Sequence, residues 1–77
     1  MSTPPEAALV NLLSRWLAGH AADAEMRDGV VAADRASLGP EAAELVDELD
    51  AELRNGARHG DVERLVRETL EAVALGV

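Results

Sequence analysis

Segment 40–53 carries apolar residues at the spacing of one face of an α-helix, and this pattern constrains the fold more than any other part of the sequence. Its apolar positions are Ala42, Leu45, Val46, Leu49 and Leu53. Residues three and four apart lie on the same side of a helix. Pro40 suits the first helical position, where its missing N–H costs nothing. The pattern therefore predicts a helix over 40–55.

Three further segments show helical signals. Apolar residues recur on one face in 4–18 and again in 61–75. Segment 23–36 has only a thin apolar stripe, and Gly29 stands at its centre. Because glycine costs about 1 kcal/mol relative to alanine inside a helix, we expect this element to be bent, split in two or closely packed at Gly29.

Polar residues and glycine stand where these helices are expected to begin and end. Thr3 is the expected N-cap of the first helix, and Pro4 would then occupy its first helical position. Asp23 and Asp61 are the expected caps of the second and fourth helices. Gly19 is suited to end the first helix. The connections are short, which favours antiparallel neighbours in a bundle.

Composition supports an all-α fold. The chain has no Tyr, Phe or Ile and only two Thr, so it lacks most of the residues that strands favour. It also has no cysteine, which excludes disulfides and thiolate metal sites. We predict a single acidic domain spanning 1–77, folded as a compact antiparallel bundle of three to four short helices. These are expected at about 4–18, 23–36, 40–55 and 61–75. A domain this small has a small core, so we expect it to form a homo- or hetero-oligomer.

The formal net charge of −8 limits the partners that the protein can attract. Phosphate backbones and anionic membranes would be repelled, so we expect neither nucleic acid nor membrane as a partner. A basic protein surface is favoured instead. No apolar run approaches the roughly 20 residues needed to span a bilayer, and no signal peptide is evident. A cytoplasmic location is therefore expected.

Six acidic residues lie between Glu41 and Glu52, and no basic residue interrupts them. At roughly 100° per residue, four of them fall into one stripe beside the apolar face. We call this stripe the acidic edge; its members are Glu41, Glu44, Glu48 and Glu52. Asp47 and Asp50 are expected further round the polar side of the helix. Segment 61–75 differs because its charges alternate at i,i+4 spacing, in the pairs Glu63–Arg67, Arg64–Glu68 and Arg67–Glu71.

The acidic edge has two interpretations: a docking site for an Arg- or Lys-rich partner, or a solvated face of an acidic protein. Trp16, the only aromatic residue, is expected either to pack in the core or to contribute to an interface. The predicted function is a non-catalytic protein-interaction module of inhibitor, immunity, antitoxin or adaptor type. The expected partner-binding residues are Glu41, Glu44, Glu48, Glu52 and Trp16. A self-assembling structural subunit is an alternative.

Ser37-Leu38 and the acidic segment 44–53 after them resemble the prosthetic-group region of acyl carrier proteins. Those proteins are acidic four-helix domains with an Asp-Ser-Leu motif at the start of an acidic helix. The resemblance implies a carrier function with Ser37 as the attachment site for phosphopantetheine. Ala36 stands where the motif has Asp, and Gly39-Pro40 intervenes before the helix. The alternative is that Ser37 is a turn or capping residue.

Catalytic motifs are absent from the sequence. There is no Gly-x-Ser-x-Gly, no glycine-rich phosphate loop and no Glu-x-x-His pair of the kind used by di-metal bundles. His20 and His59 fall in expected connections. We therefore expect no enzymatic activity, no metal and no cofactor.

Overall fold

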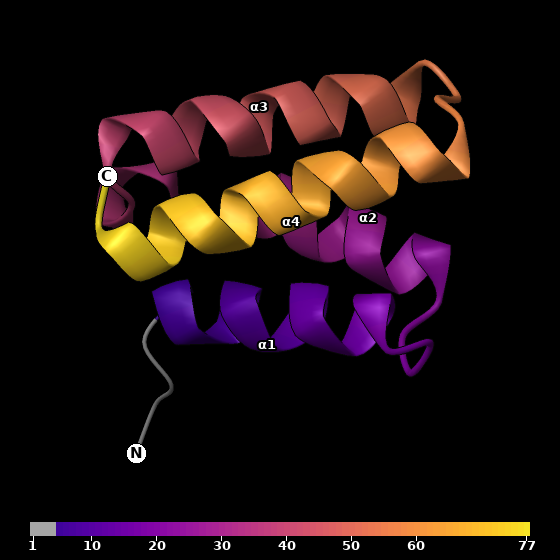
Figure 1. Cartoon of the computed structure of the whole chain (residues 1–77), viewed down its shortest axis with the longest axis horizontal. Helices are drawn as coiled ribbons and strands as arrows, with labels where there is room; N and C mark the ends of the chain where they lie inside the picture. The colour runs from indigo at the N-terminus through magenta and orange to yellow at the C-terminus, as the bar shows by residue number, and fades with distance from the viewer. Residues whose placement is uncertain (1–4) are drawn as a thin grey trace.

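The computed structural model of the chain describes residues 5–77. These residues form four α-helices and one short 3₁₀ turn (Figure 1). In chain order the elements are α1 (Pro5–Leu17), α2 (Asp23–Ala32), η1 (Arg35–Ser37), α3 (Pro40–Arg54) and α4 (His59–Leu75). The predicted all-α fold is confirmed.

Successive helices run antiparallel, as the short connections predicted (Figure 1). Each helix packs against two others, in the pairs α1–α2, α2–α3, α3–α4 and α4–α1. Of these four helix pairs, α3 and α4 make the most extensive contact. One end of the bundle therefore gathers the start of α1, the end of α2, the start of α3 and the end of α4. The other end gathers the opposite termini.

The core is built from the helix faces that the apolar spacing predicted. Leu13, Met26, Val30, Val46, Leu49 and Val66 are fully buried. Burying a side chain of this kind contributes about 1.5–3 kcal/mol. Thr69 is also fully buried, and its hydroxyl donates to the Leu65 carbonyl at 2.7 Å. Apolar faces from all four helices thus share one interior.

Glycine ends α1 as predicted. Gly19 has φ 81°, a conformation that residues with a side chain rarely adopt. The Gly19 N–H donates to the Trp16 carbonyl at 3.0 Å, and the His20 N–H donates to the Arg15 carbonyl at 2.7 Å. These two bonds satisfy carbonyl groups that the end of a helix leaves open. The predicted cap at Thr3 and the role of Pro4 lie outside the described residues.

The second element is shorter than predicted. Instead of continuing to residue 36, α2 ends at Ala32, because Ala33 is extended and Asp34 caps η1. The Asp34 carboxylate accepts the Ala36 N–H at 3.0 Å. Gly29 does not interrupt the helix. A Cβ there would collide with Leu12 Cδ2, so close packing is the outcome among the three that were expected.

Two predicted N-caps are wrong. The N-cap of α2 is Ala22, and Asp23 is the first helical residue. The N-cap of α4 is Arg58, and the helix begins at His59, two residues before the expected cap. Asp61 instead lies in the first turn, where its negative charge suits the positive end of the helix dipole.

The last residue of the chain packs against the start of α3. Gly76 has φ 73° and turns the backbone after α4. The Val77 carbonyl then accepts the Ala42 N–H at 2.9 Å. Gly39 makes this approach possible, because a Cβ at Gly39 would collide with the Val77 carbonyl group. The end of α4 and the start of α3 are thereby held together.

Candidate protein-interaction surface

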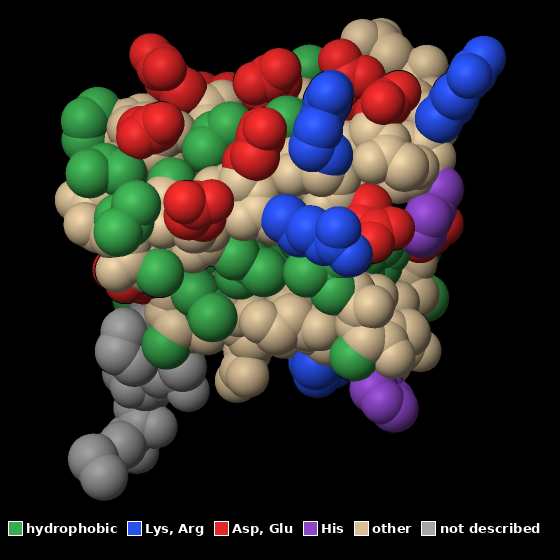
Figure 2. Space-filling model, in the orientation of Figure 1, with side chains coloured by type: hydrophobic (Ala, Val, Ile, Leu, Met, Phe, Trp, Pro, Cys, Tyr) green, Lys and Arg blue, Asp and Glu red, His purple; other side chains and the backbone are tan. Residues whose placement is uncertain are grey.

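Figure 2 shows acidic side chains along the upper surface of the bundle, where α3 lies. At its start the acidic edge adjoins α4, because Glu41 lines a groove together with α4 residues. Glu41, Glu44 and Glu48 are exposed, whereas Glu52 is half-buried. Within residues 5–77, none of these four carboxylates has an ion pair or a side-chain hydrogen bond. They are therefore held on a helix without an internal counter-charge.

The other two acidic residues of α3 are paired. Asp47 accepts a hydrogen bond from Arg35 Nε at 2.8 Å. Asp50 accepts one from Arg54, and this bond, followed by the charge of the carboxylate, raises the pKa of the Arg54 guanidinium. The two aspartates are thus neutralised within the chain, and the four glutamates are not.

The expected position of Asp50 on the polar side is wrong, because this residue is only 6% exposed. On the helical wheel it follows Val46 along the flank opposite the acidic edge. Its Oδ1 atom is buried without a hydrogen-bond partner among the described residues. Such a group costs about 1–3 kcal/mol. Helix α3 packs against both α2 and α4, and its buried face is wider than the stripe of apolar residues that the sequence showed.

A groove of about 340 Å³ lies between the start of α3 and the end of α4. We call it the end groove; its walls are Glu41, Leu45, Glu68, Glu71, Ala72 and Leu75. Leu75 is 68% exposed. Figure 2 shows hydrophobic side chains gathered at this end of the molecule, with acidic side chains around them. The acidic edge therefore borders a partly apolar hollow.

Helix α4 contributes acidic residues that the sequence interpretation did not assign to this surface. Only one of the three predicted i,i+4 pairs lies within salt-bridge distance, namely Glu63–Arg67 at 2.6 Å. Glu68 and Glu71 have no ion pair within the described part of the chain. Glu68 and Glu71 are three residues apart, and Leu75 follows four residues later. This spacing indicates that all three lie on the same side of the helix, so it could have been recognised in the sequence.

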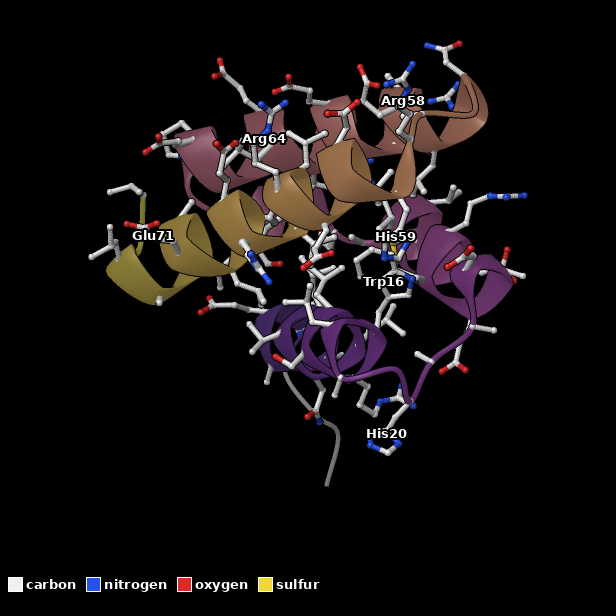
Figure 3. All side chains as sticks on the ribbon, turned by 45° about the vertical axis from the view of Figure 1, so that its right-hand side comes forward. Trp16, His20, Arg58, His59, Arg64 and Glu71 are labelled. Atoms are coloured by element: carbon white, nitrogen blue, oxygen red, sulfur yellow. The ribbon has the colours of Figure 1, made fainter. Side chains whose placement is uncertain are left out.

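Basic residues border the other half of the acidic edge. Arg58 precedes α4, and Arg64 lies along the junction between α3 and α4, while Glu71 lies toward the opposite end (Figure 3). The end groove has no basic residue in its walls. Carboxylates without an ion pair among the described residues are therefore concentrated where α3 begins and α4 ends.

Trp16 lies at the far end of the bundle from Glu71, and so from the end groove (Figure 3). It is only 6% exposed, and its indole N–H donates to Asp23 Oδ1 at 2.8 Å. The ring of His59 lies against it, with 5.1 Å between the ring centroids. Trp16 thus packs in the core, which leaves little of its surface for a partner.

The two histidines and Ser37 are exposed. His20 lies in the connection after α1 (Figure 3), and His59 begins α4, with Glu63 3.7 Å away. Ser37 is the last residue of η1, and its hydroxyl donates to the Asp34 carbonyl at 2.8 Å. This bond is typical of a residue that stabilises a turn.

The described residues place no group of three or more His, Asp or Glu side chains where they could hold a metal ion together. No helix between Pro5 and Val77 has the length and apolar character that crossing a bilayer requires. Comparisons of the chain with profiles of protein families, with curated proteins and with solved structures give no match.

Proposed function

We propose that this protein is a non-catalytic interaction module that binds a basic protein surface through the acidic edge. The observation that carries the proposal is the unequal pairing along α3. Arg35 and Arg54 neutralise the two aspartates, whereas the four glutamates have no cationic partner within residues 5–77. A basic partner would supply the missing charge.

Electrostatics favour this class of partner. Like charges at i,i+4 spacing destabilise a helix by about 0.2–0.5 kcal/mol per pair, so a cationic surface that binds α3 also relieves this repulsion. Complementary charge accelerates encounter and opposes the binding of anionic competitors. An inhibitor, an immunity protein, an antitoxin or an adaptor is a concrete form of such a module, because a small acidic protein can cover a basic nucleic-acid-binding site.

The test is affinity capture from extracts of the native host with the tagged protein, at increasing salt concentration. The test variant combines Glu44→Gln with Glu48→Gln. The matched control combines Glu6→Gln with Asp28→Asn, which removes from α1 and α2 two exposed negative charges that have no ion pair among the described residues. We expect the wild type and the control to retain one basic protein, identified by mass spectrometry.

The Glu44→Gln/Glu48→Gln variant should lose that protein at lower salt than the control does, because fewer ion pairs hold the complex. Equal retention by both variants would contradict docking at the acidic edge. Circular dichroism checks that both variants remain helical.

A second candidate function is a carrier protein modified at Ser37. Two observations favour it: Ser37 is exposed, and it lies just before the acidic helix α3. Its hydroxyl must leave the Asp34 carbonyl before it can be esterified. Intact mass after co-expression with a phosphopantetheinyl transferase tests this candidate. A gain of one phosphopantetheine that Ser37→Ala abolishes would support it, and an unmodified chain would contradict it.

A further inference from the structure

We infer that the end groove binds a short partner segment in which one apolar side chain lies between arginine or lysine residues. This inference rests on the proposed function and adds a mode of binding to it. The apolar side chain would enter the groove between α3 and α4, and the flanking cations would pair with the carboxylates on its walls.

The end groove offers an apolar surface to a partner side chain. Leu75 is 68% exposed in the wall from α4, and Leu45 lies half-buried in the wall from α3. Val77 follows α4 and does not line the groove, but it is 38% exposed at the same end of the bundle, against the start of α3. Exposed large apolar side chains that gather in one place are characteristic of binding surfaces. A partner residue that covers Leu75 gains affinity from apolar burial in addition to charge.

The walls provide charge on both sides of that contact. Glu41 stands on α3, and Glu68 and Glu71 stand on α4 one helical turn apart. None of the three has an ion pair in the region the structure describes. A segment lying across the groove would therefore meet a carboxylate before and after its apolar residue. Arginine suits this position because its fork of N–H groups matches a carboxylate.

The groove is already formed in the structure. The bond from the Ala42 N–H to the Val77 carbonyl, 2.9 Å long, ties the two walls together at their end. A partner then orders its own segment but does not have to order the groove, which improves affinity.

Charge decides among the possible occupants. A second copy bound through the same face would bring its own Glu41, Glu68 and Glu71 against these three carboxylates. Nucleic acid and anionic lipid would add further negative charge. A basic segment with an apolar side chain complements both the carboxylates of the groove and the exposed side chain of Leu75.

The test measures binding of two fluorescein-labelled peptides by fluorescence anisotropy. One peptide has a leucine between two pairs of arginines, and the other has serine in place of the leucine. We expect the wild type to bind the leucine peptide several-fold more tightly. Leu75→Ser should remove that preference while leaving the affinity for the serine peptide unchanged. Because Leu75 is largely exposed, this variant should fold, which circular dichroism verifies.

The charged rim is tested with the same peptides. Glu68→Gln combined with Glu71→Gln should weaken both complexes and flatten their salt dependence. The Glu6→Gln/Asp28→Asn control removes equal charge elsewhere and should bind almost as the wild type does. An equal loss of affinity in this control would overturn the inference, because net charge alone would then explain binding.

Two other outcomes separate the inference from the proposed function. If wild type binds the leucine and serine peptides equally, the apolar anchor is wrong, while docking of a basic partner through charge stands. If neither peptide binds at millimolar concentration, the inference is overturned. The capture experiment with Glu44→Gln/Glu48→Gln then decides the proposed function separately.

Discussion

At the scale of single residues, the buried carboxylate of Asp50 is the least expected group in the structure. One of its oxygens accepts a hydrogen bond from Arg54, and the other is buried without a hydrogen-bond partner among the described residues. Arg54 itself is largely exposed. The pair therefore combines a buried carboxylate with a solvated guanidinium. Truncating one residue should change the stability of the protein differently from truncating the other.

We predict opposite effects of truncating the two members of this pair. Asp50→Ala removes the unpartnered oxygen and leaves Arg54 in water, so it should stabilise the protein by about 1 kcal/mol. Arg54→Ala leaves a buried carboxylate with no partner and should destabilise the protein. Urea denaturation followed by circular dichroism measures both effects. Destabilisation by Asp50→Ala would show that the carboxylate is satisfied in solution.

At the scale of secondary-structure elements, the junction between the end of α4 and the start of α3 holds the end groove in shape. Val77 reaches α3 because Gly39 has no side chain, and its carbonyl accepts the Ala42 N–H. A helix otherwise leaves its first N–H groups without partners. This contact thus serves the stability of α3 and the geometry of the groove together.

Gly39→Ala should break this junction. Its Cβ would collide with backbone atoms of Val77, which have no side-chain rotation to relieve the contact. We expect a loss of about 1 kcal/mol, the typical net value of one hydrogen bond, and faster hydrogen exchange at the Ala42 amide. Gly60→Ala is the control, because a Cβ there meets open space in α4. Equal exchange at Ala42 in both variants would contradict the role of Gly39.

At the scale of the whole molecule, the charge of −8 is unevenly distributed. The acidic edge and the α4 residues Glu68 and Glu71 form one acidic surface, while four of the seven arginines pair with acids outside it. Repulsion within this surface opposes the compact state. The same repulsion opposes association through that face.

Salt should therefore stabilise the folded protein. Added NaCl screens repulsion along the acidic edge, where each neighbouring pair costs about 0.2–0.5 kcal/mol. The urea midpoint should rise with NaCl concentration in the wild type. It should rise less steeply in Glu44→Gln/Glu48→Gln than in the Glu6→Gln/Asp28→Asn control. A midpoint independent of salt would show that the carboxylates are too far apart or too solvated to interact.

The small size of the domain leads us to expect self-association. The acidic surface makes that association depend on salt if it involves α3 and α4. If copies associate, raising salt should strengthen contacts made through α3 and α4 and leave apolar contacts elsewhere almost unchanged. An apolar groove between α1 and α2, lined by Leu9, Leu12 and Gly29 among others, is one such surface. Sedimentation equilibrium at several salt concentrations measures the strength of self-association. A monomer at every micromolar concentration would contradict self-assembly.

Local signals in the sequence determined the helices. Apolar spacing placed the core faces of α1, α3 and α4, and Gly19 and Pro40 stand where α1 ends and α3 begins. These features act within a few residues of the chain, so they can be read without knowing the packing. The error at the end of α2 has a local cause too, because the Asp34 side chain offered the backbone an alternative to continuing the helix.

Only the tertiary structure decided which polar residues lie together. It buried Asp50, placed Trp16 at the opposite end of the bundle from Glu71, and brought Glu68 and Glu71 into one groove with Glu41. Helical periodicity gives the angle of a residue about its own axis, but it does not say which neighbouring helix covers that angle. The acidic edge was visible in the sequence, whereas the groove beside it exists only because α4 returns antiparallel along α3.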